Sequence, residues 1–211
     1  MTNKGSRQDH RLSSSAIIVF LRKPELGKVK TRLAKTMGDR EALAIYRTLI
    51  EKTLKSVLEC HLSTYLFFFP RIDSQILDSY PSFIPHLQKG EDLGSKMFEA
   101  FEEILQKHAQ AIIIGTDCPY LTPELLTEAQ FELEEHDVVI GPAHDGGYYL
   151  LGLKENDRKL FTNVNWSTDT VFRETISIIE DQQKTYYSLP MLSDIDFEED
   201  WIHYQDDLKR T

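Results

Sequence analysis

The sequence predicts an α/β fold, with a single domain built around a mostly parallel β-sheet. Short apolar segments alternate with longer segments of helical periodicity, which is the order that consecutive βαβ units produce. The apolar segments are fully apolar rather than alternating, as strands covered on both faces are. The length of 211 residues also fits one domain, since most domains contain roughly 50 to 250 residues.

The first part of the chain contains two expected strands and two expected helices. The apolar run 16–21 predicts the first strand, and a loop containing proline and glycine follows it. Apolar residues at helical spacing, Tyr46 among them, predict a helix over 39–58. The run 64–70 predicts the second strand, and a short helix is expected near 74–79.

The middle of the chain continues this alternation. Asp92 is a suitable N-cap for a helix that extends to about His108. The run 111–115 is the clearest strand in the sequence. A helix is expected over 123–135, since Thr122 can cap it and a proline occupies its first turn.

The last part of the chain departs from simple βαβ order. The segments 137–143 and 147–153 read as strands joined by the turn sequence HDGG, which predicts a small antiparallel excursion. A helix over about 168–180, a strand over 185–190 and an acidic helical C-terminus complete the prediction.

Composition and charge limit the classes of partner. The hydrophobic share of 41% and the charged share of 27% are ordinary for a globular protein. The net charge of −10 argues against binding to nucleic acid or anionic lipid, because both need a basic face. Cys60 and Cys118 have no CxxC spacing, which fits a reducing cytoplasm and argues against a structural zinc site.

The N-terminal residues carry no targeting signal. Residues 1–14 are polar and lack the apolar core of a signal peptide, so we expect a loose tail before a domain over 15–211. No apolar run approaches the ~20 residues that span a bilayer. We therefore expect a cytoplasmic protein without a membrane partner.

A basic loop follows the first predicted strand. Between Leu21 and Lys35 the sequence carries six basic residues against the single acidic Glu25. In an open α/β sheet, ligands bind outside the carboxyl ends of the strands. Gly27 would let the backbone approach a phosphate that these cations neutralise. The alternative is a solvated basic turn; a Walker sequence is absent.

Acidic residues at three later positions suggest a metal or acceptor site. Asp117 ends a buried strand and could hold a divalent cation against phosphates, or could cap the following turn. Asp145 begins a tight turn that continues with two glycines. This turn either only joins the two strands of a hairpin, or also leaves room for a sugar or base because the glycines have no side chains. Asp194 and Asp196 would lie on the same side of an extended segment, either as further metal ligands or as a solvated acidic face. Cys118 is expected to be a buried small residue rather than a nucleophile.

Together these motifs resemble one known family over residues 16–201. The strings PxxGxVKTRL, GxDLGxxM, DCPxLTP, GPxxDGGYYL, WST and LPxxxDxDxxED occur in that order. They are similar to bacterial glycosyltransferase-A-like proteins of the nucleotide-diphospho-sugar transferase superfamily, called radical-SAM/selenodomain-associated transferases. These proteins are related to molybdenum-cofactor and 2-phospholactate nucleotidyltransferases.

The resemblance implies a three-layer, Rossmann-like glycosyltransferase-A fold and a role for several residues. Asp117 would be the main ligand of Mg²⁺ or Mn²⁺, with Asp194 or Asp196 completing the site. The residues implied to face phosphate are Gly27, Lys28, Lys30 and Arg32. Those implied to lie near the base or ribose are Gly90, Asp92 and Gly94. Those implied to line the acceptor or sugar pocket are Asp145, Gly146, Gly147, Tyr148, Trp166, Ser167 and Thr168.

The implied activity is a metal-dependent transferase that acts on a nucleotide and a small acceptor. Transfer of a nucleotidyl group from a nucleoside triphosphate is favoured, with Lys28, Lys30, Arg32 and Asp117 stabilising charge. A glycosyltransferase that uses a nucleotide sugar, with Asp145 as base, is an alternative. A nucleotide-binding module without catalysis is a third. The base, the acceptor, the oligomeric state and the pathway stay open.

Overall fold

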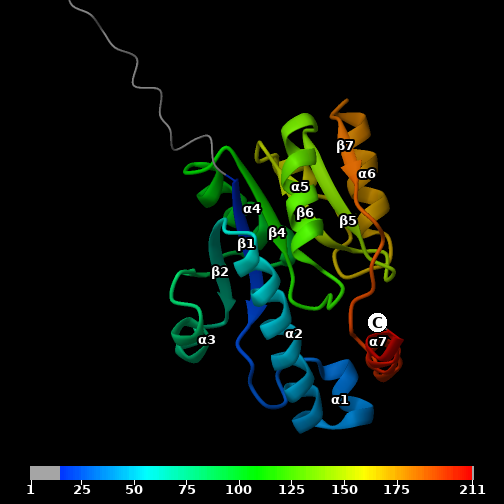
Figure 1. Ribbon diagram of the computed structural model, residues 1–211. Helices are drawn as coiled ribbons and strands as arrows, with labels where there is room; N and C mark the ends of the chain where they lie inside the picture. Colours follow the sequence, from blue (N-terminus) through cyan, green and yellow to red (C-terminus); the bar gives the residue numbers. More distant parts are fainter. Residues whose placement is uncertain (1–14, 211) are drawn as a thin grey trace, which may run out of the picture.

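The computed structural model describes residues 15–210, and the expected tail over 1–14 lies outside the described residues. Within the described chain, seven strands form one sheet in the order β3-β2-β1-β4-β6-β5-β7, with helices on both faces (Figure 1). The strands are β1 (Ser15–Arg22), β2 (Ser63–Phe69), β3 (Ile84–Leu87), β4 (Gln110–Ile114), β5 (Val138–Pro142), β6 (Tyr148–Leu153) and β7 (Tyr186–Ser188). The helices are α1 (Thr31–Met37), α2 (Asp39–Glu59), α3 (Ser74–Ser79), α4 (Leu93–Leu105), α5 (Pro123–Glu135), the 3₁₀ turn η2 (Arg158–Leu160), α6 (Val171–Asp181) and α7 (Glu198–Arg210).

The sheet is mostly parallel, as predicted. The strands β3, β2, β1 and β4 run parallel to one another, and β7 is parallel to β5, whereas β6 is antiparallel to both β4 and β5. The β5–β6 hairpin is the predicted antiparallel excursion. The fold is therefore the three-layer α/β fold that the sequence indicates.

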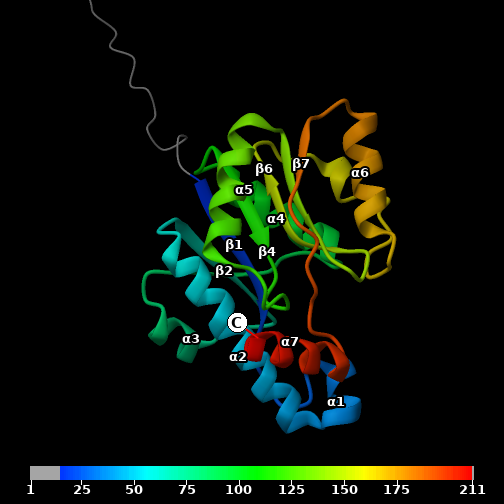
Figure 2. The ribbon, with the colours of Figure 1, turned by 45° about the vertical axis from the view of Figure 1, so that its right-hand side comes forward.

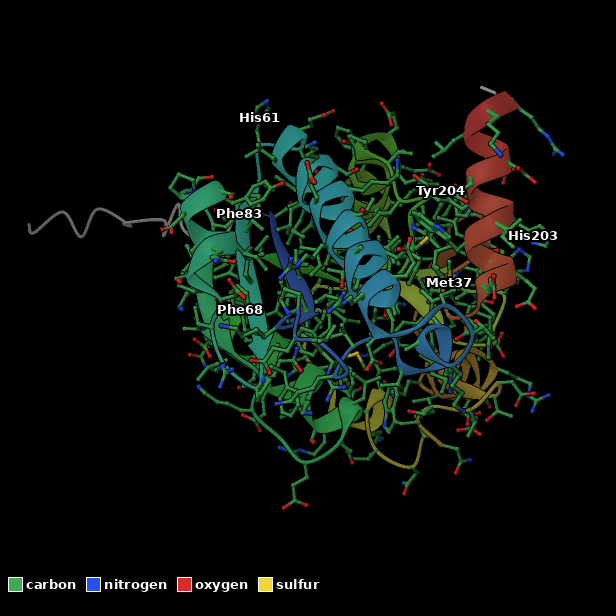
Figure 3. The ribbon with its side chains drawn as sticks, turned by 90° about the horizontal axis from the view of Figure 1, so that it is seen from below. Met37, His61, Phe68, Phe83, His203 and Tyr204 are labelled. Carbon is green, nitrogen blue, oxygen red and sulfur yellow. The ribbon has the colours of Figure 1, made fainter. Side chains whose placement is uncertain are left out.

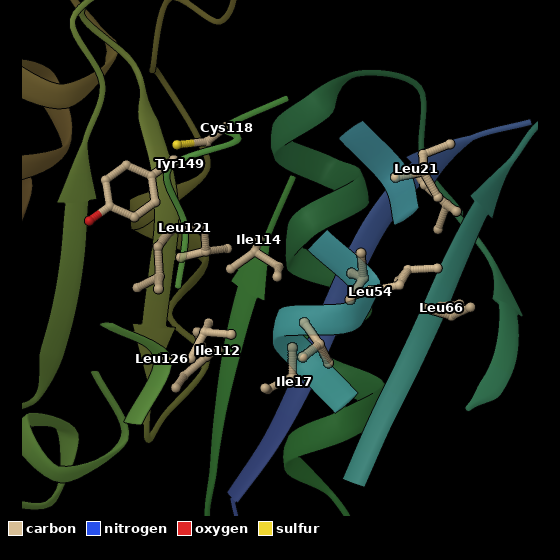
Figure 4. Close-up of a cluster of buried hydrophobic side chains, with 14 of the residues drawn as sticks. Ile17, Leu21, Leu54, Leu66, Ile112, Ile114, Cys118, Leu121, Leu126 and Tyr149 are labelled. Carbon is tan, nitrogen blue, oxygen red and sulfur yellow. The ribbon is translucent and has the colours of Figure 1, made fainter. Parts of the chain in front are cut away.

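Side chains of β1 alternate between two buried clusters, one on each face of the sheet. Ile17, Val19 and Leu21 pack with residues of α2 and α5, as Figure 4 shows for part of this cluster. Ala16 and Ile18 pack with residues of α4 and α6. Burial on both faces explains why the strand sequence is continuously apolar.

The predicted helix caps are present. The Asp92 side chain accepts a hydrogen bond from Ser95 N at 2.7 Å and forms a capping box at the start of α4. Thr122 accepts from Leu125 N at 3.4 Å at the start of α5, where proline occupies the first turn. In contrast to the prediction, α4 ends at Leu105 rather than near His108.

Three elements were not predicted: α1, β3 and the 3₁₀ turn η2. The helix α1 arises within the basic loop and is held by its apolar residue Leu33, which is fully buried against α2 and α7. Gly38, with φ of 81°, separates α1 from α2. The strand β3 has the sequence IPHL, with Pro85 and no fully buried residue, so only its pairing with the edge of β2 defines it.

The C-terminal helix α7 lies away from the sheet, beside α1 and α2 (Figure 2). Tyr204 is its buried residue and packs in a cluster with Ile45 and Ile195. Figure 3 shows Tyr204 on the side of α7 that faces α2, and His203 on the opposite side. The segment before α7 is thereby brought across the C-terminal end of β4. Among the described helices, none is long and apolar enough to span a membrane.

Candidate active site

A cleft of about 640 Å³ opens at the carboxyl ends of β1, β2 and β4. Its lining comes from the loop after β1, the start of α4, the segment after β4 and the segment before α7. This is the edge of an open α/β sheet where ligands bind. The predicted site residues that line it are Lys30, Arg32, Asp92, Asp117, Tyr148, Ser167, Asp194 and Asp196.

Lys30 and Asp117 meet in this cleft. Lys30 precedes α1 in a left-handed conformation with φ of 46°, and its side chain is only 5% exposed. Its Nζ lies 2.7 Å from Asp117 Oδ1 and 3.5 Å from Asp196 Oδ1, and donates to the Ile195 carbonyl at 2.6 Å. These three acceptors occupy all three N–H donors of the ammonium.

The charge of Lys30 is maintained by its neighbours. Burial alone disfavours the ammonium, but the carboxylate of Asp117, followed by those of Asp196 and Asp194, outweighs burial and raises the pKa of Lys30. The side chain is thus a fixed cation that joins the segment after β4 to the segment before α7.

Asp194 and Asp196 have different surroundings. Asp196 accepts from Arg32 Nη1 at 2.8 Å, so both of its carboxylate oxygens face a cation. Asp194 Oδ1 is buried and has no hydrogen-bond partner among the described residues. Burial, and then the nearby carboxylates of Asp117 and Asp145, raise the pKa of Asp194 to about 7.

This arrangement fits a divalent cation held jointly by protein and substrate. Magnesium in such sites uses one or two carboxylates plus phosphate oxygens and water. Asp117, whose side chain is 47% exposed, and the unpaired oxygen of Asp194 can supply the protein ligands. A group of three or more His, Cys, Asp or Glu side chains that could hold a metal ion by themselves is not found among residues 15–210.

The basic loop is divided between the cleft and the solvent. Arg32 lines the cleft with 58% of its side chain exposed, and its guanidinium is accessible to a phosphate. Lys28 is 72% exposed, pairs with Glu25 at 3.3 Å and does not line the cleft. Glu25 also pairs with Arg71. Gly27 lies in the same turn, with φ of 72°, outside the cleft lining.

The remaining predicted residues support the walls of the cleft. A Cβ atom at Gly146 would lie 2.1 Å from Asp169 O, and one at Gly94 would lie 2.3 Å from Trp166 Nε1, so these glycines permit close packing. Asp145 Oδ1 accepts from Gly147 N at 2.9 Å. Besides Gly27 and Lys28, the predicted residues that are not among those lining the cleft are Gly90, Gly94, Asp145, Gly146, Gly147, Trp166 and Thr168.

Tyrosine side chains complete the inner surface, and one of them was expected only as a core residue. Tyr46 lines the cleft. Its hydroxyl donates a hydrogen bond to Arg22 O at 3.2 Å and accepts one from Arg22 N at 2.9 Å. Burial, and then the Asp117 carboxylate, raise the pKa of Tyr46 to about 12. Tyr148 stands edge-on to Trp166 with ring centroids 6.4 Å apart. The buried Cys118 has a pKa raised to about 12 by burial, as expected for an unreactive thiol.

Other lining residues were not predicted at all. Gln88, Phe69 and Lys96 lie at the opposite end of the cleft from Asp194. They belong to the β2 and β3 ends and to the first turns of α4, and no motif in the sequence marks them. Only the edge pairing of β3, which has no clear sequence signal, brings Gln88 to the cleft.

Comparison with known proteins identifies the family. The family model DUF2064, described as uncharacterized protein conserved in bacteria, matches residues 53–168, which is more than half of the chain. The chain belongs to the DUF2064 family. No curated protein matches the sequence significantly.

Solved structures share the fold of this DUF2064 protein. A candidate nucleotide-diphospho-sugar transferase from Desulfovibrio desulfuricans G20 is 29% identical, with a TM-score of 0.81 over 88% of this chain and 84% of that one. The 4-diphosphocytidyl-2C-methyl-D-erythritol synthase from Anaerococcus prevotii DSM 20548 is 13% identical, with a TM-score of 0.61 over 93% and 96%. The manganese complex of Rv0371c from Mycobacterium tuberculosis H37Rv is 11% identical, with a TM-score of 0.56 over 91% and 97%.

Of these three structures, only the one at 29% identity is similar enough to bear on more than the fold, and its name is that of a nucleotide-diphospho-sugar transferase. The predicted glycosyltransferase-A-like fold is confirmed by the first of them in particular. The relatives below 25% identity establish the fold alone. Function is therefore inferred from the cleft of this chain.

Proposed function

We propose that this DUF2064 protein is a metal-dependent nucleotidyltransferase that moves a nucleotidyl group from a nucleoside triphosphate to a small phosphorylated or sugar acceptor. The observation that carries the proposal is the convergence of Lys30, Asp117 and the unpaired Asp194 oxygen in one cleft. The candidate nucleotide-diphospho-sugar transferase that shares the fold supports a nucleotide-handling reaction in general.

Asp117 and Asp194 are the proposed ligands of Mg²⁺ or Mn²⁺. Asp196 is a weaker candidate, because Arg32 and Lys30 already face its two oxygens. When bound, the cation would neutralise phosphate charge and orient the phosphates. The manganese complex of Rv0371c supports a divalent cation in this fold.

The chain's own residues would provide alignment and charge. An acceptor oxygen attacks the α-phosphorus, the new P–O bond forms, and the bond to the β-phosphate oxygen breaks to release pyrophosphate. Little covalent assistance is needed, so fixed positive charge is the main contribution. Arg32 is an exposed cation of the cleft and a better phosphate ligand than Lys30, whereas Lys30 holds Asp117 and the 194–196 segment in position. Lys28 would contribute only after release from Glu25.

Glycosyl transfer is the second candidate, and the name of the Desulfovibrio relative favours it. The same cation site would then hold the diphosphate of a nucleotide sugar, and Asp145 would act as the base toward an acceptor hydroxyl. Asp145 already accepts a hydrogen bond from Gly147 N and lies outside the cleft lining. This geometry favours a turn-forming role for Asp145 and, with it, nucleotidyl transfer.

The two reactions differ in their products. The protein is incubated with each nucleoside triphosphate, Mn²⁺ and a panel of sugar phosphates, and pyrophosphate is measured. Nucleotide sugars with the same acceptors form the parallel arm. Pyrophosphate release supports nucleotidyl transfer, and nucleoside diphosphate release supports glycosyl transfer. Metal-independent nucleotide binding with neither product would favour a binding module instead.

A matched pair of variants tests the metal ligands. Asp194→Asn is expected to weaken Mn²⁺ binding in the presence of nucleotide at least tenfold, since it replaces a ligand carboxylate with a neutral amide. Asp196→Asn removes the same charge two residues away and is expected to change Mn²⁺ binding far less. Equal effects in calorimetry would contradict the assignment of Asp194.

Two finer assignments also remain proposals. The narrower resemblance to radical-SAM/selenodomain-associated transferases, and through them to molybdenum-cofactor and 2-phospholactate nucleotidyltransferases, rests on the sequence motifs. A cytoplasmic location rests on the cysteine usage, and Cys60 and Cys118 are both free thiols in the structure.

A further inference from the structure

The side chain of Gln88 places a fixed hydrogen-bond acceptor in the cleft. Its Nε2 donates to Phe67 O at 2.9 Å and to Leu21 O at 3.5 Å, so both amide hydrogens are directed to backbone carbonyls. A flipped amide would set its oxygen against the same two carbonyl oxygens, and the observed orientation is therefore the favourable one. Gln88 lines the cleft, so Oε1 is the amide atom left for a ligand there, and no described residue is seen to donate to it.

The spacing between Gln88 and the proposed cation site lets one nucleotide contact both, the cation site with its phosphates and Gln88 with its base. Asp117 follows β4 and Gln88 follows β3, and the sheet order places β1 and β2 between these strands. The backbones of these two strand ends are three spacings of about 4.8 Å, or roughly 14 Å, apart, but the Gln88 amide reaches across β2 to Leu21 O on β1, the strand beside β4. The amide therefore lies roughly one to two strand spacings from the end of β4. A nucleotide with its phosphates at Asp117 would extend its sugar along the cleft and its base toward Gln88.

The surroundings of Gln88 suit a flat, polar ring. Phe69 lines this end of the cleft, and Lys96 Nζ lies 4.1 Å from the centre of its ring. Glu91 and Asp92 also line the cleft here, and Asp92 is held in place as the N-cap of α4. Arg22 also faces the Phe69 ring, at 5.1 Å from its centre, so the ring offers a base only the surface that these two cations leave uncovered. Gln88 Oε1 and the two carboxylates are all hydrogen-bond acceptors.

The geometry points to selection for a base that carries an exocyclic amino group, as in cytosine or adenine, over one with a carbonyl at that position, as in uracil or hypoxanthine. This inference rests on the proposed function. An amino group would donate to Gln88 Oε1. A carbonyl in its place would set two acceptors against each other and leave both without a donor.

Two pairs of natural nucleotides test the inference on the unmodified protein. CTP and UTP have the same phosphates and ribose, and differ where an amino group is replaced by a carbonyl; ATP and ITP form the corresponding purine pair. Binding is measured by calorimetry with Mn²⁺ present. We expect CTP to bind at least about tenfold more tightly than UTP, or ATP to bind at least about tenfold more tightly than ITP. A difference of this size follows because the amino group gains one hydrogen bond and avoids one repulsion between acceptors.

The variant Gln88→Met assigns the selectivity to one side chain. It keeps the length of the side chain and removes the acceptor, so the ratio of affinities within the preferred pair is expected to fall to within about threefold. Gln75→Met makes the same change on the exposed surface of α3 and should leave the ratio unchanged. Inorganic tripolyphosphate, which has no base, should bind both variants as it binds the unmodified protein.

The outcomes separate the two levels of the proposal. If nucleotides bind but neither pair differs by more than about threefold, base selection by Gln88 is wrong and the proposed function stands. A preserved ratio in Gln88→Met also overturns the assignment to Gln88. If neither nucleotides nor tripolyphosphate bind, both proposals fail. Should Gln88→Met not fold, the nucleotide pairs on the unmodified protein still decide the question.

Discussion

Replacement of Lys30 by methionine tests the central contact of the cleft. The change keeps the aliphatic length and removes the ammonium that contacts Asp117, Asp196 and the Ile195 carbonyl. A hydrogen bond from a charged donor contributes about 1.5–3 kcal/mol, and the pairing with Asp117 is discounted because that side chain is 47% exposed. Loss of the ammonium also removes its own desolvation cost. We therefore expect Lys30→Met to lower the free energy of unfolding by about 2 kcal/mol.

Lys28→Met is the matched control, since it lies two residues away in the same loop. Lys28 is 72% exposed and pairs with Glu25 at the surface, so its removal should cost less than about 0.5 kcal/mol. Urea unfolding measures both values. A loss of about 2 kcal/mol corresponds to a fall of about 4–8 °C in the melting temperature of a domain of this size. If the two variants differ by less than about 0.5 kcal/mol, Lys30 does not hold the cleft together as described.

Three further perturbations have expected outcomes. Gly146→Ala and Gly38→Ala place a side chain at similar φ values of 87° and 81°, but only the first would meet the Asp169 carbonyl, at 2.1 Å. Gly38 has a ψ of 157°, in a region essentially restricted to glycine, so Gly38→Ala should cost about 1–3 kcal/mol in urea unfolding. Gly146→Ala should cost at least about 2 kcal/mol more, and equal costs would contradict the packing. Burial lowers the pKa of His108 below its usual value. The stability that the neutral ring contributes is therefore present above about pH 6.5 and is lost as the pH falls through the folded pKa. His108→Gln should flatten the decline of the urea unfolding midpoint between pH 7 and 5, and an unchanged decline would contradict this role of His108. Tyr46→Phe leaves the Arg22 backbone groups without their partner and should cost about 1–3 kcal/mol, while a loss below about 0.5 kcal/mol in urea unfolding would show that water replaces the hydroxyl.

The elements that the sequence predicts correctly have strong local signals. The cap of α4 depends on Asp92 and Ser95, three residues apart, and the hairpin turn depends on Asp145 and Gly146, so both are visible in short windows. The helix α1 has no acidic residue in its first turn and no side-chain cap. It forms because Leu33 is buried by α2 and by residues near the C-terminus, a tertiary effect that no local window contains.

The candidate site also has features that local sequence predicts and features that only tertiary contacts decide. Sequence places Lys28 and Lys30 in one basic loop and cannot distinguish them. The structure separates them because Glu25 pairs with Lys28 locally, whereas the carbonyl that binds Lys30 belongs to Ile195, 165 positions away. Sequence spacing indicates which residue types end a strand, but contacts of this length depend on the complete topology.

The charge of the assembled cluster gives a physical reason for its proposed ligand. Asp117, Asp145, Asp194 and Asp196 converge, and two cations, Lys30 and Arg32, contact this cluster directly. Fully ionised, the group would carry two uncompensated negative charges, and the pKa of Asp194, raised to about 7, shows that burial beside like charges already disfavours the last carboxylate. Protonation of Asp194 relieves only one of these charges. A divalent cation would balance both, and triphosphate oxygens would then fill the coordination positions that two carboxylates leave open. Metal and nucleotide should therefore bind this cleft cooperatively, each strengthening the binding of the other.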